Sequence, residues 1–175
     1  MILLCSRRTC LAGLAVAACL GASQPALAGF SLTTSSAPTS SVTLDGTNQT
    51  GSYTMDLTVD NSGAGSTTAG WNLSITSTQF STGGGRTLST NASSLTAVTT
   101  ACSVGPCTDP ANSISYPVAL PAGSPAPAPD TFFSTPANTG TGTFSVSPTV
   151  EVTVPANAYA GTYTSTLTLA LAAGP

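Results

Sequence analysis

The stretch Gly70-Trp71-Asn72-Leu73-Ser74-Ile75-Thr76-Ser77-Thr78-Gln79-Phe80 decides the fold class of this chain. Trp71, Leu73 and Ile75 are apolar, and the residues between them are polar. A period of two is typical of a β-strand that buries one face. Trp71 is the only tryptophan in the sequence, and its ring is the largest single block of apolar surface that the fold can bury. Its alternation with Leu73 and Ile75 predicts a core position, with a ligand platform as the alternative.

The same alternation recurs along the rest of the chain. It covers residues 53–60, 114–120, 150–154 and 163–171, with shorter pieces at 30–32, 42–44 and 144–146. No stretch shows helical periodicity, and the abundant Thr and Val favour strands. Many short strands separated by turn residues predict an all-β fold, an antiparallel β-sandwich of the Ig-like, Greek-key type. We expect residues 53–60 and the Trp71 strand to form an antiparallel hairpin.

The segments between these strands carry weaker signals. Residues 89–110 contain only short β-like pieces, and Pro117 restricts its strand to an edge or a bulge. Residues 122–129 are rich in Pro and Ala, which predicts an exposed polyproline-like connection. Ala160-Gly161-Thr162-Tyr163 resembles the corner of Ig-like sandwiches where a tyrosine hydroxyl bonds to the upstream backbone.

Residues 1–28 predict a signal peptide. Arg7 and Arg8 precede an apolar run over residues 11–20, and Ala26-Leu27-Ala28 supplies the small residues of a cleavage site. We expect cleavage between Ala28 and Gly29, which leaves residues 29–175 as a single domain. That region contains no apolar stretch long enough for a transmembrane helix.

Two alternatives to a plain signal peptide remain open. The residues around Arg7 and Arg8 resemble a twin-arginine export signal, which implies export after folding. Val16-Ala17-Ala18-Cys19 resembles a bacterial lipobox, which would leave Cys19 acylated at the new N-terminus. All three options place the protein outside the cytoplasm, secreted or at the cell surface.

The region after the leader is acidic and has few charges. It carries one basic residue, Arg86, against six acidic ones. Binding to nucleic acid by counterion release needs many Lys and Arg side chains, so a nucleic-acid partner is excluded. An anionic membrane is disfavoured for the same reason.

Two cysteines, Cys102 and Cys107, lie in this region. In an exported chain such a pair predicts a disulfide. Four residues separate the two cysteines, whereas a redox pair usually has two between them. We therefore expect a structural bond.

The same region offers little for catalysis. It lacks His and Lys, which removes the commonest general base and the amine nucleophile. Asp56 and Asp60 fall on one side of a strand and are expected to face solvent, and a calcium site that includes Asp45 has no loop signature. Gly83-Gly84-Gly85-Arg86 lacks the Lys-Ser/Thr ending of a phosphate-binding loop. We expect no enzyme, no cofactor and no metal site.

Two parts of the chain resemble the WxL family, cell-surface domains of Gram-positive bacteria that attach non-covalently to the wall. Gly70-Trp71-Asn72-Leu73 followed by Phe80 resembles the first motif of the family. The terminal stretch from Tyr163 to Leu171, with Gly174-Pro175 at the end, resembles the second. There the family reads Trp-x-Leu before Asp-Ala-Pro, whereas this chain has Leu169 and Ala173-Gly174. The chain is most similar to divergent, actinobacterial-type members.

The resemblance implies a surface protein that binds peptidoglycan or another cell-wall glycan. It places ligand contacts at Trp71, Asn72 and Leu73, and the second motif at Leu169 and Leu171. Leu169 cannot stack on a sugar ring as an indole does.

The alternative is a structural subunit of a surface assembly. Gly161-Thr162-Tyr163 leads into a Thr-alternating terminal strand, which resembles pilus and spore-coat β-sandwich subunits. Such subunits join through strand edges, with other surface proteins as partners.

Overall fold

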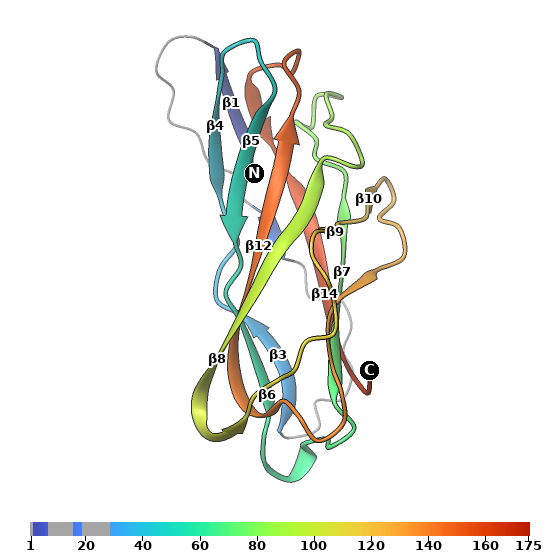
Figure 1. Ribbon diagram of the computed structural model, residues 1–175. Helices are drawn as coiled ribbons and strands as arrows, with labels where there is room; N and C mark the ends of the chain where they lie inside the picture. Colours follow the sequence, from blue (N-terminus) through green and yellow to red (C-terminus); the bar gives the residue numbers. More distant parts are fainter. Residues whose placement is uncertain (1, 7–15, 19–28) are drawn as a thin grey trace.

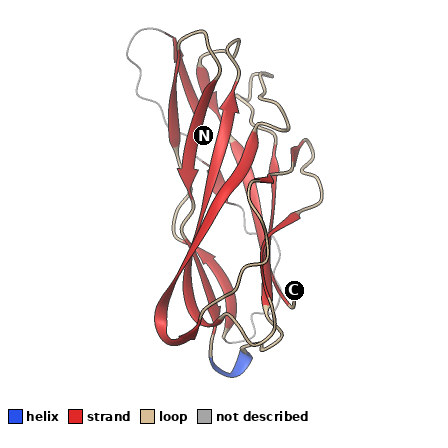
Figure 2. Cartoon of the chain, in the orientation of Figure 1, coloured by secondary structure: helices blue, strands red, loops and turns tan. Residues whose placement is uncertain are grey.

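A computed structural model describes residues 2–6, 16–18 and 29–175 (Figure 1). Strands dominate the described chain, and its one helical element is a single 3₁₀ turn (Figure 2). In chain order the elements are β1 (Ile2–Ser6), β2 (Val16–Ala18), β3 (Phe30–Thr34), β4 (Ser40–Leu44), β5 (Gln49–Thr54), β6 (Leu57–Asn61), η1 (Gly63–Gly65), β7 (Trp71–Thr78), β8 (Ser93–Thr108), β9 (Val118–Ala119), β10 (Ala122–Gly123), β11 (Asp130–Thr135), β12 (Thr141–Val154), β13 (Gly161–Tyr163) and β14 (Ser165–Ala173).

The first layer is built around β12. This strand pairs antiparallel with β8 on one side, and with β6 and then β5 on the other. β3 extends the sheet beyond β6, and β9 extends it beyond β8.

The predicted strand over residues 53–60 is divided into β5 and β6 opposite Pro148 of β12. The Pro148 carbonyl accepts a hydrogen bond from the Met55 N–H at 3.0 Å. The proline nitrogen has no hydrogen with which to return that bond, so the pairing is interrupted there. Burial still alternates from Tyr53 through Met55 and Leu57 to Val59, so the predicted inward face is confirmed.

The second layer is built around β7. β14 pairs with one edge of β7, and β11 and β10 share the other. β13 runs into β14 with only Thr164 between them. β1 lies between β13 and β4, antiparallel to the first and parallel to the second, and β2 runs parallel along β14 (Figure 1).

The two layers pack face to face, which confirms the predicted all-β antiparallel sandwich. Apolar side chains from both inner faces fill the space between them. The largest fully buried ones are Trp71, Tyr163, Phe132, Phe133, Phe144, Leu57, Leu73, Ile75 and Leu95.

The predicted hairpin between residues 53–60 and the Trp71 strand is wrong. β6 lies in the first layer between β3 and β12, whereas β7 lies in the second layer. The chain crosses between layers after Asn61, whose buried side chain holds the crossing. Its Nδ2 donates to the Gly140 carbonyl at 2.8 Å, and its Oδ1 accepts from the Thr67 N–H at 2.7 Å.

Three further expectations for the first layer and the connections need correction. Residues 93–108 form one long strand rather than short pieces, and residues 144–146 and 150–154 belong to the single strand β12. Residues 122–123 form β10 and pair with β7, so this part of the proline-rich connection is docked on a sheet edge. Of the predicted strand over residues 114–120 only the two-residue β9, Val118–Ala119, forms; it lies at the edge of the first layer, directly after Pro117.

The predicted tyrosine corner is confirmed. The Tyr163 hydroxyl donates to the Tyr159 carbonyl at 3.2 Å, and the Tyr163 ring is buried. Arg7, Arg8, Cys19 and Ala28 lie outside the described residues, and Gly29 is the residue before β3. None of the helices among the described residues has the length and apolarity to span a membrane.

Candidate functional site

Trp71 is a core residue. Its exposed fraction is 0%, its ring stacks on Phe133 with centroids 5.1 Å apart, and its Nε1–H donates to the Gly140 carbonyl at 2.8 Å. Gly140 has a φ of 68°, and a Cβ there would collide with the indole nitrogen, so only glycine fits. The alternation with Leu73 and Ile75 therefore predicted the ring's place correctly.

The Gly140 carbonyl ties the two layers together at this end of the sandwich. It accepts from Trp71 in the second layer and from Asn61 in the first, both at 2.8 Å. The buried indole N–H has this carbonyl as its partner, whereas Asn61 Nδ2 also donates to the Thr67 carbonyl at 3.1 Å.

The two stretches that carry the family resemblance lie on neighbouring strands. β7 and β14 pair antiparallel, with Leu73 opposite Leu171 and Ile75 opposite Leu169. Leu73 and Leu169 point into the core, with exposed fractions of 0% and 9%. Asn72 is half-buried, and its Nδ2 donates to the Gly174 carbonyl at 2.7 Å. Trp71 and Leu73, predicted as ligand contacts, are thus closed off from solvent in this structure.

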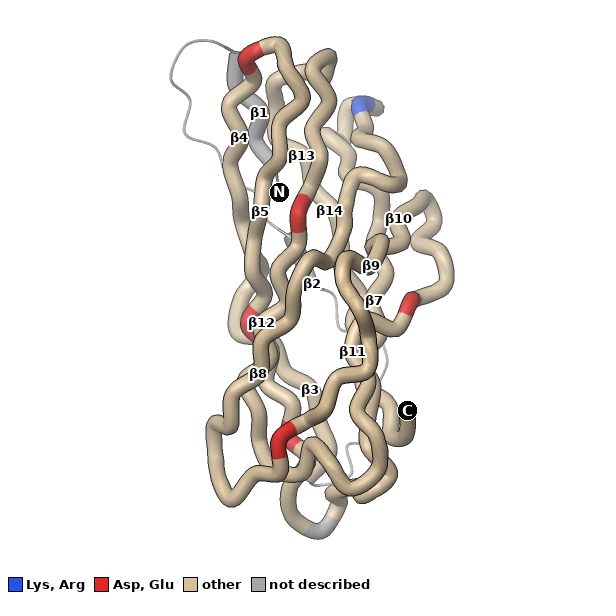
Figure 3. The backbone as a smooth tube through the Cα atoms, viewed as in Figure 1, with Lys and Arg blue, Asp and Glu red and all other residues tan. Residues whose placement is uncertain are grey.

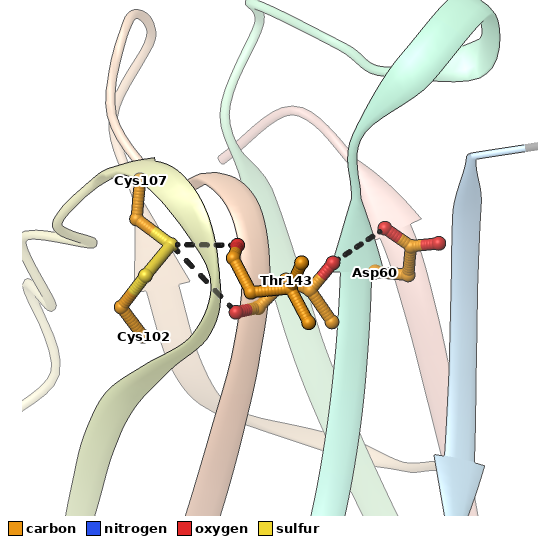
Figure 4. The surroundings of a disulfide bond; sticks show 5 residues. Asp60, Cys102, Cys107 and Thr143 are labelled. Atoms are coloured by element: carbon orange, nitrogen blue, oxygen red, sulfur yellow. Dashed lines mark hydrogen bonds between the residues drawn. A yellow bond between two sulfur atoms is a disulfide. The ribbon is translucent and has the colours of Figure 1, made fainter.

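The predicted disulfide between Cys102 and Cys107 is present, with Cα atoms 6.1 Å apart. It lies in an irregular part of β8. There Val104 pairs with Thr143 and Thr108 with Thr141, so four residues of advance along β8 match two along β12. The Cys107 sulfur lies 3.2 Å from the Val104 carbonyl oxygen and 3.7 Å from that of Thr143 (Figure 4). A disulfide sulfur carries no proton, so these are contacts and not hydrogen bonds; the first lies within β8, and only the second reaches β12.

An open hollow of about 330 Å³ lies beside the disulfide. Its lining comes from the β6–β7 crossing, the irregular part of β8 and the start of β12: Asn61, Ser62, Gly63, Ser66, Val104, Gly105, Pro106, Thr141, Gly142 and Thr143. Asp60 lies at its edge and accepts hydrogen bonds from Ser62 at 2.6 Å and Thr143 at 3.1 Å. None of the lining residues is charged, and both hydroxyl-bearing and apolar side chains line the hollow.

Charged side chains are spread along the molecule rather than gathered in one site (Figure 3). Among the described residues no three potential metal ligands lie together. Asp45 accepts from the Thr47 hydroxyl and N–H at 2.7 and 2.9 Å, and these bonds lower the pKa of its carboxyl. The Arg86 guanidinium lies 3.5 Å above the exposed Tyr159 ring, at one end of the sandwich.

The second layer has an unusual construction at the edge formed by β13 and β14. β4 and β13 do not pair with each other, and in the described chain β1 alone joins them. Val42 of β4 lies over Gly51 of β5, where an added Cβ would come within 2.7 Å of the Val42 side chain. β4 thus faces the first layer across the interior, and one strand position separates it from β13.

The outer edge of β14 continues this gap. The Ser77 N–H, opposite Leu167, donates to the Pro121 carbonyl on the far side of β7. Directly opposed residues in an antiparallel pair exchange both hydrogen bonds or neither. The backbone groups of Leu167, Leu169 and Leu171 therefore point away from β7, toward the edge where β2 pairs with residues 165–167 only.

Buried core side chains also line this edge. Met55, Leu57, Leu167 and Leu169 surround a small apolar hollow of about 10 Å³, together with Thr34, Ser36 and Pro38 from the end of β3 and the β3–β4 connection. We call the region between β4 and β13–β14, including this hollow, the strand channel.

The strand channel has no signature in the sequence. Residues 2–6 and 16–18, which occupy it, show no strand alternation. Their partners β13 and β14 are more than a hundred residues away, and β4 is 38 residues from β1. The Thr-alternating terminal strand, identified above as a possible assembly element, is the one part of it that sequence alone indicated. No protein-family model, no curated protein and no solved structure matches this chain.

Proposed function

We propose that the protein is a non-enzymatic protein of the bacterial cell surface that joins other chains through the strand channel. The observation that carries this proposal is the missing strand position between β4 and β13–β14, filled in the described chain by the leader segments. Once the leader is cleaved, the outward backbone groups of β14 form an unpaired sheet edge. Such an edge binds extended segments of other chains by adding a strand.

Three further features support an assembly role. Leu167 and Leu169 line the channel and belong to the core, so a strand that replaces the leader would keep this apolar surface covered as well as form backbone hydrogen bonds. The low charge of the mature region reduces repulsion between like molecules. β13 and β14 contain no acidic residue.

The test is self-association of residues 29–175, measured by sedimentation velocity over a range of concentrations. We expect concentration-dependent multimers. Leu171→Pro removes one outward N–H from the edge and should weaken association, whereas Leu171→Ala keeps that N–H and serves as the matched control. A protein that stays monomeric at every concentration, alone and with other envelope proteins, would contradict the proposal.

A second candidate function is non-covalent binding to peptidoglycan or another wall glycan, as the WxL resemblance implies. The hollow beside the disulfide favours it, because its volume of about 330 Å³ falls within the range of small-molecule sites, about 300–1,000 Å³. Trp71 and Leu73 take no part in this version, since both are buried.

A pull-down on purified peptidoglycan tests the second candidate. Ser66→Arg fills the hollow and should abolish retention, whereas Ser52→Arg places the same side chain on the exposed face of β5 and should not. Equal retention of both variants would show that the hollow is not the glycan site.

A further inference from the structure

We propose that the leader is a placeholder strand: residues Ile2–Ser6 and Val16–Ala18 occupy the strand channel of the precursor and keep it closed to partners until the leader is removed. The inference rests on the proposed function and adds how the site is regulated. It commits to one occupant before cleavage, the leader itself, and to one class of partner afterwards, an extended segment of a neighbouring surface protein.

β1 pairs with a neighbouring strand on each of its two edges. It pairs in parallel with all five residues of β4, from Ile2 opposite Ser40 to Ser6 opposite Leu44. Its other edge pairs with β13 in the antiparallel sense, with Ile2 opposite Tyr163 and Leu4 opposite Gly161. Both edges of β1 are thus used, and this is the pairing of a central strand.

Without β1, the edge of β4 that faces β13 loses its strand partner. In the described part of the chain β1 is the only strand that pairs with the backbone of β4. Removal of residues 1–28 leaves the facing edges of β4 and β13 unpaired, with room for one strand between them. An unpaired edge of this kind is a template for another chain.

The leader leaves part of the β14 edge uncovered, where a partner strand can begin to replace it. β2 covers β14 only at residues 165–167, and the backbone groups of Leu169 and Leu171 beyond it stay free on that side among the described residues. The small apolar hollow of about 10 Å³, lined by Leu167 and Leu169, lies where the pairing with β2 ends. A partner strand can pair there first and then extend into the positions of β2 and β1.

The side chains that flank the channel determine which partner segment fits it. Val42 and Leu44 of β4 are half-buried against the core and Tyr163 of β13 is fully buried, whereas Thr43 is exposed. A strand in register between them faces the core at every second position. The partner segment therefore carries apolar side chains at alternate positions and small or polar ones between them.

The test locks the placeholder in its register. Cys5 lies directly opposite Thr43, so Thr43→Cys allows a disulfide between the two strands when the precursor is oxidised with oxidised glutathione. All variants carry Cys10→Ser and Cys19→Ser, which leaves Cys5 as the only free leader thiol. Ser41→Cys is the matched control, because it lies two positions out of register and disulfides require Cα atoms within about 7 Å.

A protease recognition sequence between Ala28 and Gly29 then separates the leader from the domain in vitro. We expect the cross-link with Thr43→Cys and not with Ser41→Cys, as read by mass spectrometry of the uncleaved chain. After cleavage the unlocked protein should form multimers, and the locked protein should remain monomeric until dithiothreitol releases the leader. Unlocked protein treated with dithiothreitol controls for reduction of Cys102–Cys107.

The outcomes separate this inference from the proposed function. If cleaved, unlocked protein stays monomeric, the assembly function fails and the inference fails with it. If locked and unlocked proteins assemble equally, or both cysteine variants cross-link equally, only the placeholder role is overturned. Should Thr43→Cys not fold, Leu3→Cys with Ser41→Cys and Cys5→Ser moves the lock to the next pair of the same register. The buried Trp71 provides the check of folding by its emission.

Discussion

Trp71 shows how far a single residue can be interpreted from sequence. Its alternation with Leu73 and Ile75 predicted a buried ring, and the structure confirms it. The sequence could not show what satisfies the indole N–H, because the Gly140 carbonyl is 69 residues away. Nor could it show Asn61 as a buried partner of the same carbonyl, since Asn before Ser-Gly is typical of a turn.

Trp71→Phe is expected to reduce the free energy of unfolding by about 1–3 kcal/mol. The change removes the Nε1–H bond to Gly140 and leaves a cavity beside Phe133. Urea unfolding followed by circular dichroism measures it, because the variant has no tryptophan. Tyr159→Phe, at an exposed ring, is the control and should change stability by less than about 0.5 kcal/mol. Unchanged stability of Trp71→Phe together with lost glycan binding would contradict the core assignment.

Because the Tyr53 hydroxyl is buried, we expect the protein to lose stability at alkaline pH. Burial raises the pKa of this hydroxyl above the ordinary value of 10.0. Below that value the hydroxyl is protonated in both states, and above it only the unfolded chain releases the proton readily. Stability therefore falls as the pH rises above about 10, by about 1.4 kcal/mol per pH unit for this group.

Tyr53→Phe should flatten that dependence, as measured by urea unfolding between about pH 9 and 11. Burial also raises the pKa of half-buried Tyr116, so Tyr116→Phe is expected to reduce the slope less than Tyr53→Phe. An identical slope in wild type and Tyr53→Phe would show that Tyr53 does not carry the effect.

Individual strands were predictable where one face is buried and the other is exposed to solvent. β7 and β14 meet that condition, and the sequence located both. β8 does not: from Ala97 onward most of its side chains are exposed, so its backbone pairing with β12 leaves no pattern in the residues. Pairing itself was less predictable, because β6 and β7 are neighbours in sequence but each has its edges filled by distant strands.

The disulfide supports the irregular part of β8. Replacing Cys102 and Cys107 together by Ser should lower the free energy of unfolding by about 2 kcal/mol, the loop-entropy value for so short a loop. Thermal unfolding with and without reductant measures the loss, and reduction of wild type should reproduce it. A melting temperature that responds to neither change would mean that β12 alone holds this part of β8.

At the scale of the whole molecule, the second layer is complete only with the described residues 2–6 and 16–18 in place. The first layer is continuous from β3 to β9 within residues 29–175, whereas the second layer uses β1 and β2. The predicted domain 29–175 thus contains both sheets and the core but leaves one strand position open. This openness connects the fold to the proposed assembly role.

Amide hydrogen exchange along β14 tests that role most directly. In monomeric protein 29–175, the amides of Leu167, Leu169 and Leu171 point away from β7 and should exchange rapidly, while those of Thr168, Ala170 and Ala172 should be protected by β7. In the assembled protein the first three should become protected and the second three should not change. Protection of all six in the monomer, or no gain at Leu167, Leu169 and Leu171 on assembly, would contradict the account.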